Sequence, residues 1–129
     1  MADTIAKGLK TTFLIHAVTG VVFGLAYLLA PVATGDLYGF AMLDPGGYRV
    51  LGAALVGFAA SSWLAYQADT WAAVRIVVLM EIVWTVVGAI AVVWGIFAGD
   101  LPATGWLNFG LLAAFAIAFA FFYMKREAA

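Results

Sequence analysis

The chain has 129 residues, of which 67% are hydrophobic and only 10% are charged. Soluble domains carry about a quarter charged residues, so six basic and seven acidic side chains are too few to cover this chain in water. The composition excludes an ordinary soluble enzyme, a disordered tail and a nucleic-acid-binding protein, which needs a basic surface. The absence of cysteine and the single histidine exclude disulfides, thiolate catalysis and metal sites that need cysteines or two histidines. The sequence predicts an all-α integral membrane protein with one domain, residues 1–129.

Four apolar stretches are each near the ~20 residues that cross a bilayer as a helix. They cover about residues 11–30, 48–68, 72–98 and 105–124. Alternation with a period of two is absent, which favours helices over barrel strands. The first stretch is about twice as long as the apolar region of a signal peptide, so we expect a true span there.

The connections between these predicted spans differ in length and character. Residues 36–43 are too apolar for a solvated loop, which predicts a short interfacial segment. Only a few residues join the second and third spans, so we expect those two to pack as an antiparallel hairpin. The third and fourth spans are joined nearly as closely. Asp44 before Pro45, the pair Asp69-Thr70, and Thr104 are predicted helix N-caps.

Basic residues predict the orientation of the spans in the membrane. One side of the predicted bundle carries Lys7, Lys10, Arg75, Lys125 and Arg126, whereas the other carries only Arg49. Because cytoplasmic loops are enriched in lysine and arginine, an up-down antiparallel bundle with both termini in the cytoplasm is expected. The alanine- and glycine-rich, lysine-poor composition indicates the plasma membrane of a prokaryote.

Small residues predict where the helices pack, because helices in lipid associate through close backbone contact. The candidates are Gly20 and Gly24 in the first span, Ala53 and Gly57 in the second, and Gly110, Ala114 and Ala118 in the fourth. Packing within one bundle is the first interpretation, and dimerisation is the second.

A stripe of Phe115, Phe119 and Phe122 shares one face of the fourth span. We interpret it as a face that contacts lipid, with a second copy or another subunit as the alternatives. Arg75 lies six residues from Glu81, on another side of its helix, so we expect it to extend to lipid phosphates.

Polar side chains from three predicted spans fall at one depth, roughly 8–10 Å inside the same membrane edge at 1.5 Å per residue. They are His16, Ser61, Ser62 and Glu81. An ionised Glu81 facing lipid would cost several kcal/mol. We therefore expect it to face inward, with His16 as its first partner and the serine hydroxyls next.

Three neighbours complete this candidate intramembrane site. Thr85 lies one turn after Glu81, while Trp84 lies on nearly the same side and is expected to shape a small apolar pocket together with Trp63. Four interpretations stay open: a hydrogen-bonded layer that fixes helix register, a protonatable carboxylate with His16 as shuttle, a pigment held through His16, or misplaced span boundaries. In the second interpretation the pocket takes a quinone head group or a lipophilic cation.

No motif predicts a catalytic site, and the acids outside the spans are too few for a calcium or magnesium site. The pattern Gly20-x-x-x-Gly24, the run Leu28-Leu29-Ala30-Pro31 and the pattern Arg49-x-x-Gly52 resemble small four-helix membrane proteins of the DoxX-like kind. That resemblance implies an accessory subunit beside a quinol- or redox-active membrane enzyme. Small four-helix multidrug exporters are less similar, because their working carboxylate lies in the first helix.

Two functions follow as expectations. The first is a non-catalytic accessory subunit that packs against partners in a respiratory, photosynthetic or oxygenase-type complex. The second is a small homodimeric proton-linked transporter, or a protein that binds a quinone or another lipophilic ligand, using Glu81 and His16. The expected partners are membrane lipids, other membrane subunits or a second copy, and no nucleic acid. No cofactor is predicted, and a contact with a quinone, a lipid or a pigment is the alternative.

Overall fold

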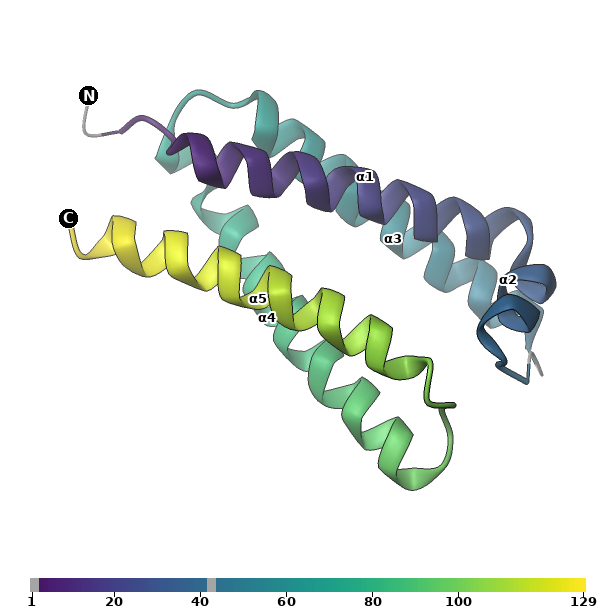
Figure 1. The fold of residues 1–129 in the computed structure, drawn as a ribbon. Coiled ribbons are helices and arrows are strands. Elements are labelled where there is room, and N and C mark those ends of the chain that lie inside the picture. The colour runs from purple at the N-terminus through teal and green to yellow at the C-terminus, as the bar shows by residue number, and fades with distance from the viewer. Residues whose placement is uncertain (1–2, 42–43) are drawn as a thin grey trace.

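The computed structural model describes residues 3–41 and 44–129, and its regular structure there is helical (Figure 1). The helices are α1 (Lys7–Leu29), α2 (Pro31–Tyr38), α3 (Pro45–Gln67), α4 (Trp71–Ala98) and α5 (Gly105–Glu127). All but α2 are long and apolar enough to cross a membrane. The predicted all-helical class with four apolar spans is confirmed, although the first helix begins at Lys7, earlier than predicted.

Two of the predicted helix caps are confirmed, and one is wrong. Asp44 Oδ1 accepts a hydrogen bond from the Gly47 amide at 3.1 Å, and Thr70 Oγ1 accepts one from the Ala73 amide at 3.4 Å. Thr104 has helical backbone angles itself, φ −60° and ψ −19°, and its side chain caps no amide of α5. Its hydroxyl instead donates to the Tyr38 carbonyl at 2.6 Å.

The short helix α2 includes only the first three residues, 36–38, of the predicted interfacial segment 36–43. It begins at Pro31, whose missing N–H costs nothing in a first helical turn. It ends before Gly39, which has a φ of 77° that favours glycine. Residues 42–43 lie outside the described part of the chain.

The long helices pack as two pairs, α1 with α3 and α4 with α5 (Figure 1). Helix α3 contacts α4 only sparsely, so the expected hairpin of the second and third spans is wrong. The short connection after Gln67 permits a hairpin, but close backbone packing decides which helices pair. That close packing occurs between α1 and α3.

Glycines bring the backbones of α1 and α3 together. A β-carbon placed on Gly24 would lie 3.0 Å from the carbonyl oxygen of Gly52, and one placed on Gly52 would lie 2.5 Å from the nitrogen of Leu28. Gly20 faces Ala59 one turn away. The seam between the two helices therefore requires glycine at its closest point, as is common for helices packed in lipid.

Most of the other predicted packing residues lie on open faces of their helices. Ala53 is exposed, and a β-carbon on Gly57 or on Gly110 would meet nothing within 4 Å. Ala114 is also exposed, whereas Ala118 is half-buried. The α3 seam instead follows Gly52, Val56 and Ala59, and the buried residues of α5 are Gly105, Ala116 and Phe119. Alanine and glycine occur on several faces of each helix, so small residues alone did not identify the packed face.

Both ends of the chain lie at one end of the molecule, here called the terminal end (Figure 1). There the Asp3 carbonyl accepts a hydrogen bond from the Trp71 amide at 2.7 Å, and Asp3 Oδ1 accepts one from the Ala72 amide at 3.3 Å. Glu127 bonds to both Trp71 and Arg75, each at 3.2 Å. These contacts tie the start of the chain and the end of α5 to the start of α4.

The guanidinium of Arg75 therefore has protein partners, Glu127 and the Tyr123 hydroxyl at 3.1 Å. Half of the Arg75 side chain is exposed, so its contact with lipid phosphates stays a prediction beside these bonds to α5. At the opposite end, here called the loop end, the two helix pairs diverge (Figure 1), and the Thr104–Tyr38 hydrogen bond connects them.

Candidate functional site

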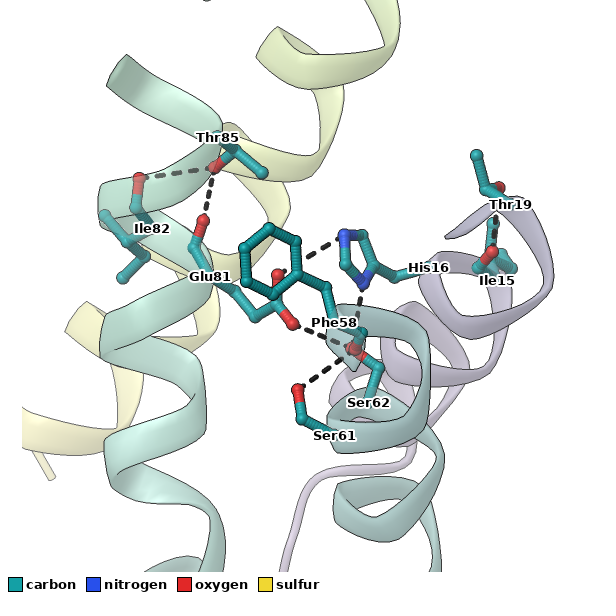
Figure 2. A network of polar contacts seen from close by, with 9 residues as sticks. All are labelled: Ile15, His16, Thr19, Phe58, Ser61, Ser62, Glu81, Ile82 and Thr85. Atoms are coloured by element: carbon teal, nitrogen blue, oxygen red, sulfur yellow. Dashed lines mark hydrogen bonds and ion pairs between the residues drawn. The ribbon is translucent and has the colours of Figure 1, made fainter. Parts of the chain in front are cut away.

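Three helices contribute one side chain each to a closed polar triangle (Figure 2). His16 of α1 lies 2.8 Å through Nδ1 from Ser62 Oγ of α3, and Ser62 donates to Glu81 Oε1 of α4 at 2.8 Å. The third side joins His16 Nε2 to Glu81 Oε2 at 3.3 Å. Ser62 and Glu81 are fully buried, and His16 is 5% exposed. We call these three residues the polar triangle.

The hydrogen-bonding capacity of each group determines where the protons are. Ser62 has one hydroxyl proton, which points to Glu81, so the Nδ1 of His16 must donate to the serine oxygen. Glu81 Oε2 accepts no hydrogen bond in this geometry, but it lies 3.3 Å from His16 Nε2, and two facing lone pairs at that distance would repel unless one proton lay between them. That proton makes either an imidazolium with a carboxylate or an imidazole with a carboxylic acid. The polar triangle has zero net charge in both states, which avoids burying a lone charge.

The fourth long helix covers the polar triangle with aromatic rings. Phe115 and Phe119 of α5 meet the His16 ring edge-on, with centroids 4.8 and 5.7 Å away. Phe119 is fully buried and also packs against Phe13 at 5.3 Å, while Phe122 is half-buried against the same core. The interpretation of this stripe as a lipid-facing surface is wrong. The sequence could not distinguish a buried phenylalanine stripe from a lipid-facing one, because lipid and protein core favour the same apolar side chains.

Other residues predicted for the site lie beside the polar triangle or away from it. Ser61 Oγ donates to the Phe58 carbonyl of its own helix at 3.0 Å, and Thr85 Oγ1 donates to the Glu81 carbonyl at 2.6 Å (Figure 2). Thr85 is fully buried, but its hydroxyl is used within α4. Trp63 is 45% exposed and is not part of the site. A step of one residue separates Ser61 from Ser62 and decides which hydroxyl faces inward.

A cavity of about 370 Å³ lies between the two helix pairs, next to the polar triangle and toward the loop end. All four long helices contribute to its walls. Its polar wall residues are His16, Thr19, Tyr27, Trp84 and Asn108, and the remaining walls are apolar side chains and glycines. A largely apolar cavity with a few polar groups is the usual form of a small-molecule site.

Trp84 carries an unused hydrogen-bond donor in this wall. Its indole Nε1 is buried and has no hydrogen-bond partner within the part of the chain that the structure describes. The Trp84 ring packs against Phe58, with centroids 4.9 Å apart. A buried donor without a partner costs free energy, and a ligand acceptor in the cavity would remove that cost once the Trp84 side chain turned its N–H toward it.

Sequence reasoning missed Asn108 and Tyr27, which both line the cavity. A signal was present for Asn108, because an amide within an apolar span is as unusual as a carboxylate. Tyr27 carried no such signal, since tyrosines near helix ends are normal at membrane interfaces.

The polar triangle also limits what His16 can bind. Both ring nitrogens already face partners, Ser62 and Glu81, so no nitrogen lone pair is presented to the cavity for a pigment magnesium. Within residues 3–41 and 44–129, no group of three or more metal-ligating side chains comes together.

Comparisons with protein-family models, with curated proteins and with solved structures find no match to this chain. The resemblance to DoxX-like proteins consequently stays a prediction from the sequence.

Proposed function

We propose that the protein binds a small, uncharged lipophilic ligand of the quinone head-group kind in the cavity between its helix pairs. The observation that supports this most directly is the buried, unpartnered indole N–H of Trp84, a residue of the largely apolar cavity wall. A ring with a carbonyl would bury its apolar faces and accept a hydrogen bond from Trp84 or Asn108. The volume of about 370 Å³ is near the lower end of ligand pockets, which suits one ring rather than a larger molecule.

The protein acts as a binding protein and not as an enzyme in this proposal. A serine, a histidine and an acid in contact resemble a hydrolytic triad, in which the serine gives its proton to the histidine. Here the Ser62 hydroxyl donates a hydrogen bond to Glu81 and accepts one from His16. Its side chain is also fully buried. The hydroxyl is therefore unable to attack a substrate carbonyl, and the polar triangle serves to hold three helices in register beneath the cavity.

The proposed setting is the plasma membrane of a prokaryote, with an up-down bundle and both termini in the cytoplasm. The common end of the two termini and the basic residues Lys7, Lys10, Lys125 and Arg126 near it support this orientation. Reporter fusions at each terminus test it, and a periplasmic signal from either one contradicts it.

A second candidate is the accessory subunit of a larger membrane complex. One observation favours it: outside its helices, the described chain contributes only short connections. Any partner must therefore meet it mainly within the bilayer. Purification in mild detergent tests this candidate, because a subunit copurifies with other polypeptides in fixed ratio whereas a binding protein migrates alone or as a dimer.

Ligand binding is tested by thermal unfolding of the purified chain in neutral detergent, with and without a benzoquinone that carries one isoprenoid unit. A ligand that binds only the folded state raises the midpoint of unfolding in proportion to its affinity. The alkylbenzene of equal length, which has no carbonyl, is expected to shift the midpoint much less. No difference between these two probes contradicts a carbonyl-recognising site.

Two matched variants locate the ligand. Trp84→Phe keeps the ring but removes the donor, so it should weaken binding about fivefold, the value of one hydrogen bond of roughly 1 kcal/mol. Trp63→Phe makes the same change at a position away from the cavity and should leave binding unchanged. Ala91→Phe fills the cavity from its wall and should abolish the shift. Equal effects of the two tryptophan variants would place the ligand elsewhere.

Proton coupling separates a transporter from a passive binding protein. If the ligand changes the number of protons held between His16 and Glu81, adding it to a weakly buffered sample releases or takes up protons. Glu81→Gln keeps hydrogen-bonding groups but holds no exchangeable acid proton, so it should abolish that signal. A ligand that binds without proton exchange in the unmodified chain contradicts the transporter alternative and leaves the binding protein.

A further inference from the structure

A second cavity, about 280 Å³, opens at the terminal end, away from the cavity described above. Its apolar walls include Leu9 and Trp71, which are buried, and Phe122, which is half-buried. Lys125 and Arg126 line it from the last turn of α5. We call it the terminal hollow. It combines an apolar wall with two cations.

The two cations are weakly engaged by protein groups. Arg126 pairs with Asp3 at 3.8 Å, which is a long contact for a guanidinium with five donors, and Glu127 is a second acidic neighbour that interacts with it electrostatically. The Lys125 ammonium lies 5.8 Å from the centroid of the Phe121 ring, and no carboxylate of the described residues lies within ion-pair distance of it. Lys125 is therefore the cation of the hollow that no carboxylate side chain of the described residues pairs with.

The position of the terminal hollow indicates which anion reaches it. Trp71 is the first residue of α4, and Lys125 and Arg126 are in the last turn of α5, so the hollow lies where two spans leave the hydrocarbon. Lipid phosphates occupy that level, and the upper part of an acyl chain lies next to it. Basic pockets between membrane helices are known sites for anionic lipid head groups.

We propose that the terminal hollow binds one anionic phospholipid, with the phosphate between Lys125 and Arg126 and the glycerol and upper acyl chain against Leu9 and Phe122. A different role for these cations would be to neutralise the negative C-terminal end of the α5 dipole. That role needs no lipid and predicts no preference among head groups. Selectivity for an anionic head group is therefore the property that distinguishes the two roles.

The experiment compares phosphatidylglycerol with phosphatidylcholine of identical acyl chains, added to the full chain in neutral detergent. Native mass spectrometry measures the retained lipid, and thermal unfolding measures the shift in midpoint. We expect phosphatidylglycerol to be retained at least tenfold more strongly. Equal retention of both lipids overturns the proposal.

Matched variants assign the site. The double variant Lys125→Gln with Arg126→Gln should lose the preference for phosphatidylglycerol about tenfold, while its unfolding midpoint without lipid stays near that of the unmodified chain. The control Lys7→Gln with Lys10→Gln removes the same charge outside the hollow and should change the preference less than about twofold. Equal loss in both variants indicates general charge attraction and overturns the proposal, as does displacement of the lipid by millimolar inorganic phosphate.

Discussion

Glu81 illustrates how a single residue constrains a membrane protein. Its side chain is fully buried in a span, and its two carboxylate oxygens face Ser62 and His16. Because the triangle requires one proton between Glu81 and His16, the acid is buried without net charge. The free-energy cost of burying this acid in a span is therefore offset by its contacts with Ser62 and His16, and not by access to water.

Substitutions at Glu81 test this neutral arrangement. Glu81→Gln retains an acceptor for Ser62 and a donor for His16, so the free energy of unfolding should change by less than about 1 kcal/mol. Glu81→Leu has a similar size but leaves both partners without a hydrogen bond, and should destabilise by about 1–3 kcal/mol. Denaturant unfolding in detergent measures both. If glutamine destabilises as much as leucine, then the proton itself is essential.

Adjacent serines provide a second test at the same scale. Ser62→Ala removes the group that joins His16 to Glu81 and should destabilise by about 1–3 kcal/mol. Ser61→Ala removes a hydroxyl that bonds only within α3, so it should change stability by less than about 0.5 kcal/mol. Similar losses from the two variants would mean that the polar triangle contributes no special stability.

The sequence predicted which residues carry polar groups at one depth, but only part of their geometry. Depth follows from counting residues along a helix, so the meeting of His16, Ser62 and Glu81 agrees with the predicted layer. The direction in which a side chain points depends on how its helix is rotated about its axis. That direction changes by 100° from one residue to the next. That rotation separates Ser62 from Ser61 and places Trp63 outside the site, and it was not visible in the sequence.

At the scale of elements, the backbone contact between α1 and α3 determines which helices pair. Gly24 and Gly52 meet at the closest point, where neither position has room for a side chain. Connection length was a poor guide, because it favoured pairing α3 with α4. Backbone approach in lipid outweighs a short loop, since loop closure changes the free energy only slightly with length.

Matched glycine substitutions test the α1–α3 seam. Gly52→Ala places a methyl group 2.5 Å from the Leu28 nitrogen, so the helices must separate, at a cost of about 1–3 kcal/mol. Gly57→Ala lies in the same helix with nothing within 4 Å and should be neutral or slightly stabilising, because alanine favours helix over glycine. Thermal unfolding compares them. A neutral Gly52→Ala contradicts the close packing.

At the scale of the whole molecule, the two helix pairs are joined firmly at one end and loosely at the other. The terminal end holds the bonds of Asp3 and Glu127 to the start of α4, whereas Thr104 and Tyr38 share one hydrogen bond at the loop end. The cavity lies toward the loop end, where the pairs diverge. These contacts involve segments outside the apolar spans, which hydropathy patterns do not describe.

Removing the Asp3 carboxylate tests the contribution of the terminal end. Asp3→Ala loses a cap on the first turn of α4 and the ion pair with Arg126, so it should destabilise by about 1 kcal/mol. Hydrogen exchange should also increase at Ala72 in the same turn. Asp36→Ala removes an exposed carboxylate at the other end and serves as the control. Unchanged exchange in Asp3→Ala would contradict a role for this cap.

The order of the helices in the polar triangle has a consequence for biogenesis. A ribosome releases α1 and α3 before α4, so His16 and Ser62 are already in the bilayer when the third long span reaches the insertion machinery. Of the three residues, Glu81 therefore enters the bilayer last, when both of its partners are already there. A nascent chain that lacks either partner must insert Glu81 into the bilayer without it. Membrane insertion of α4, and not the stability of the folded protein, is then the step most affected.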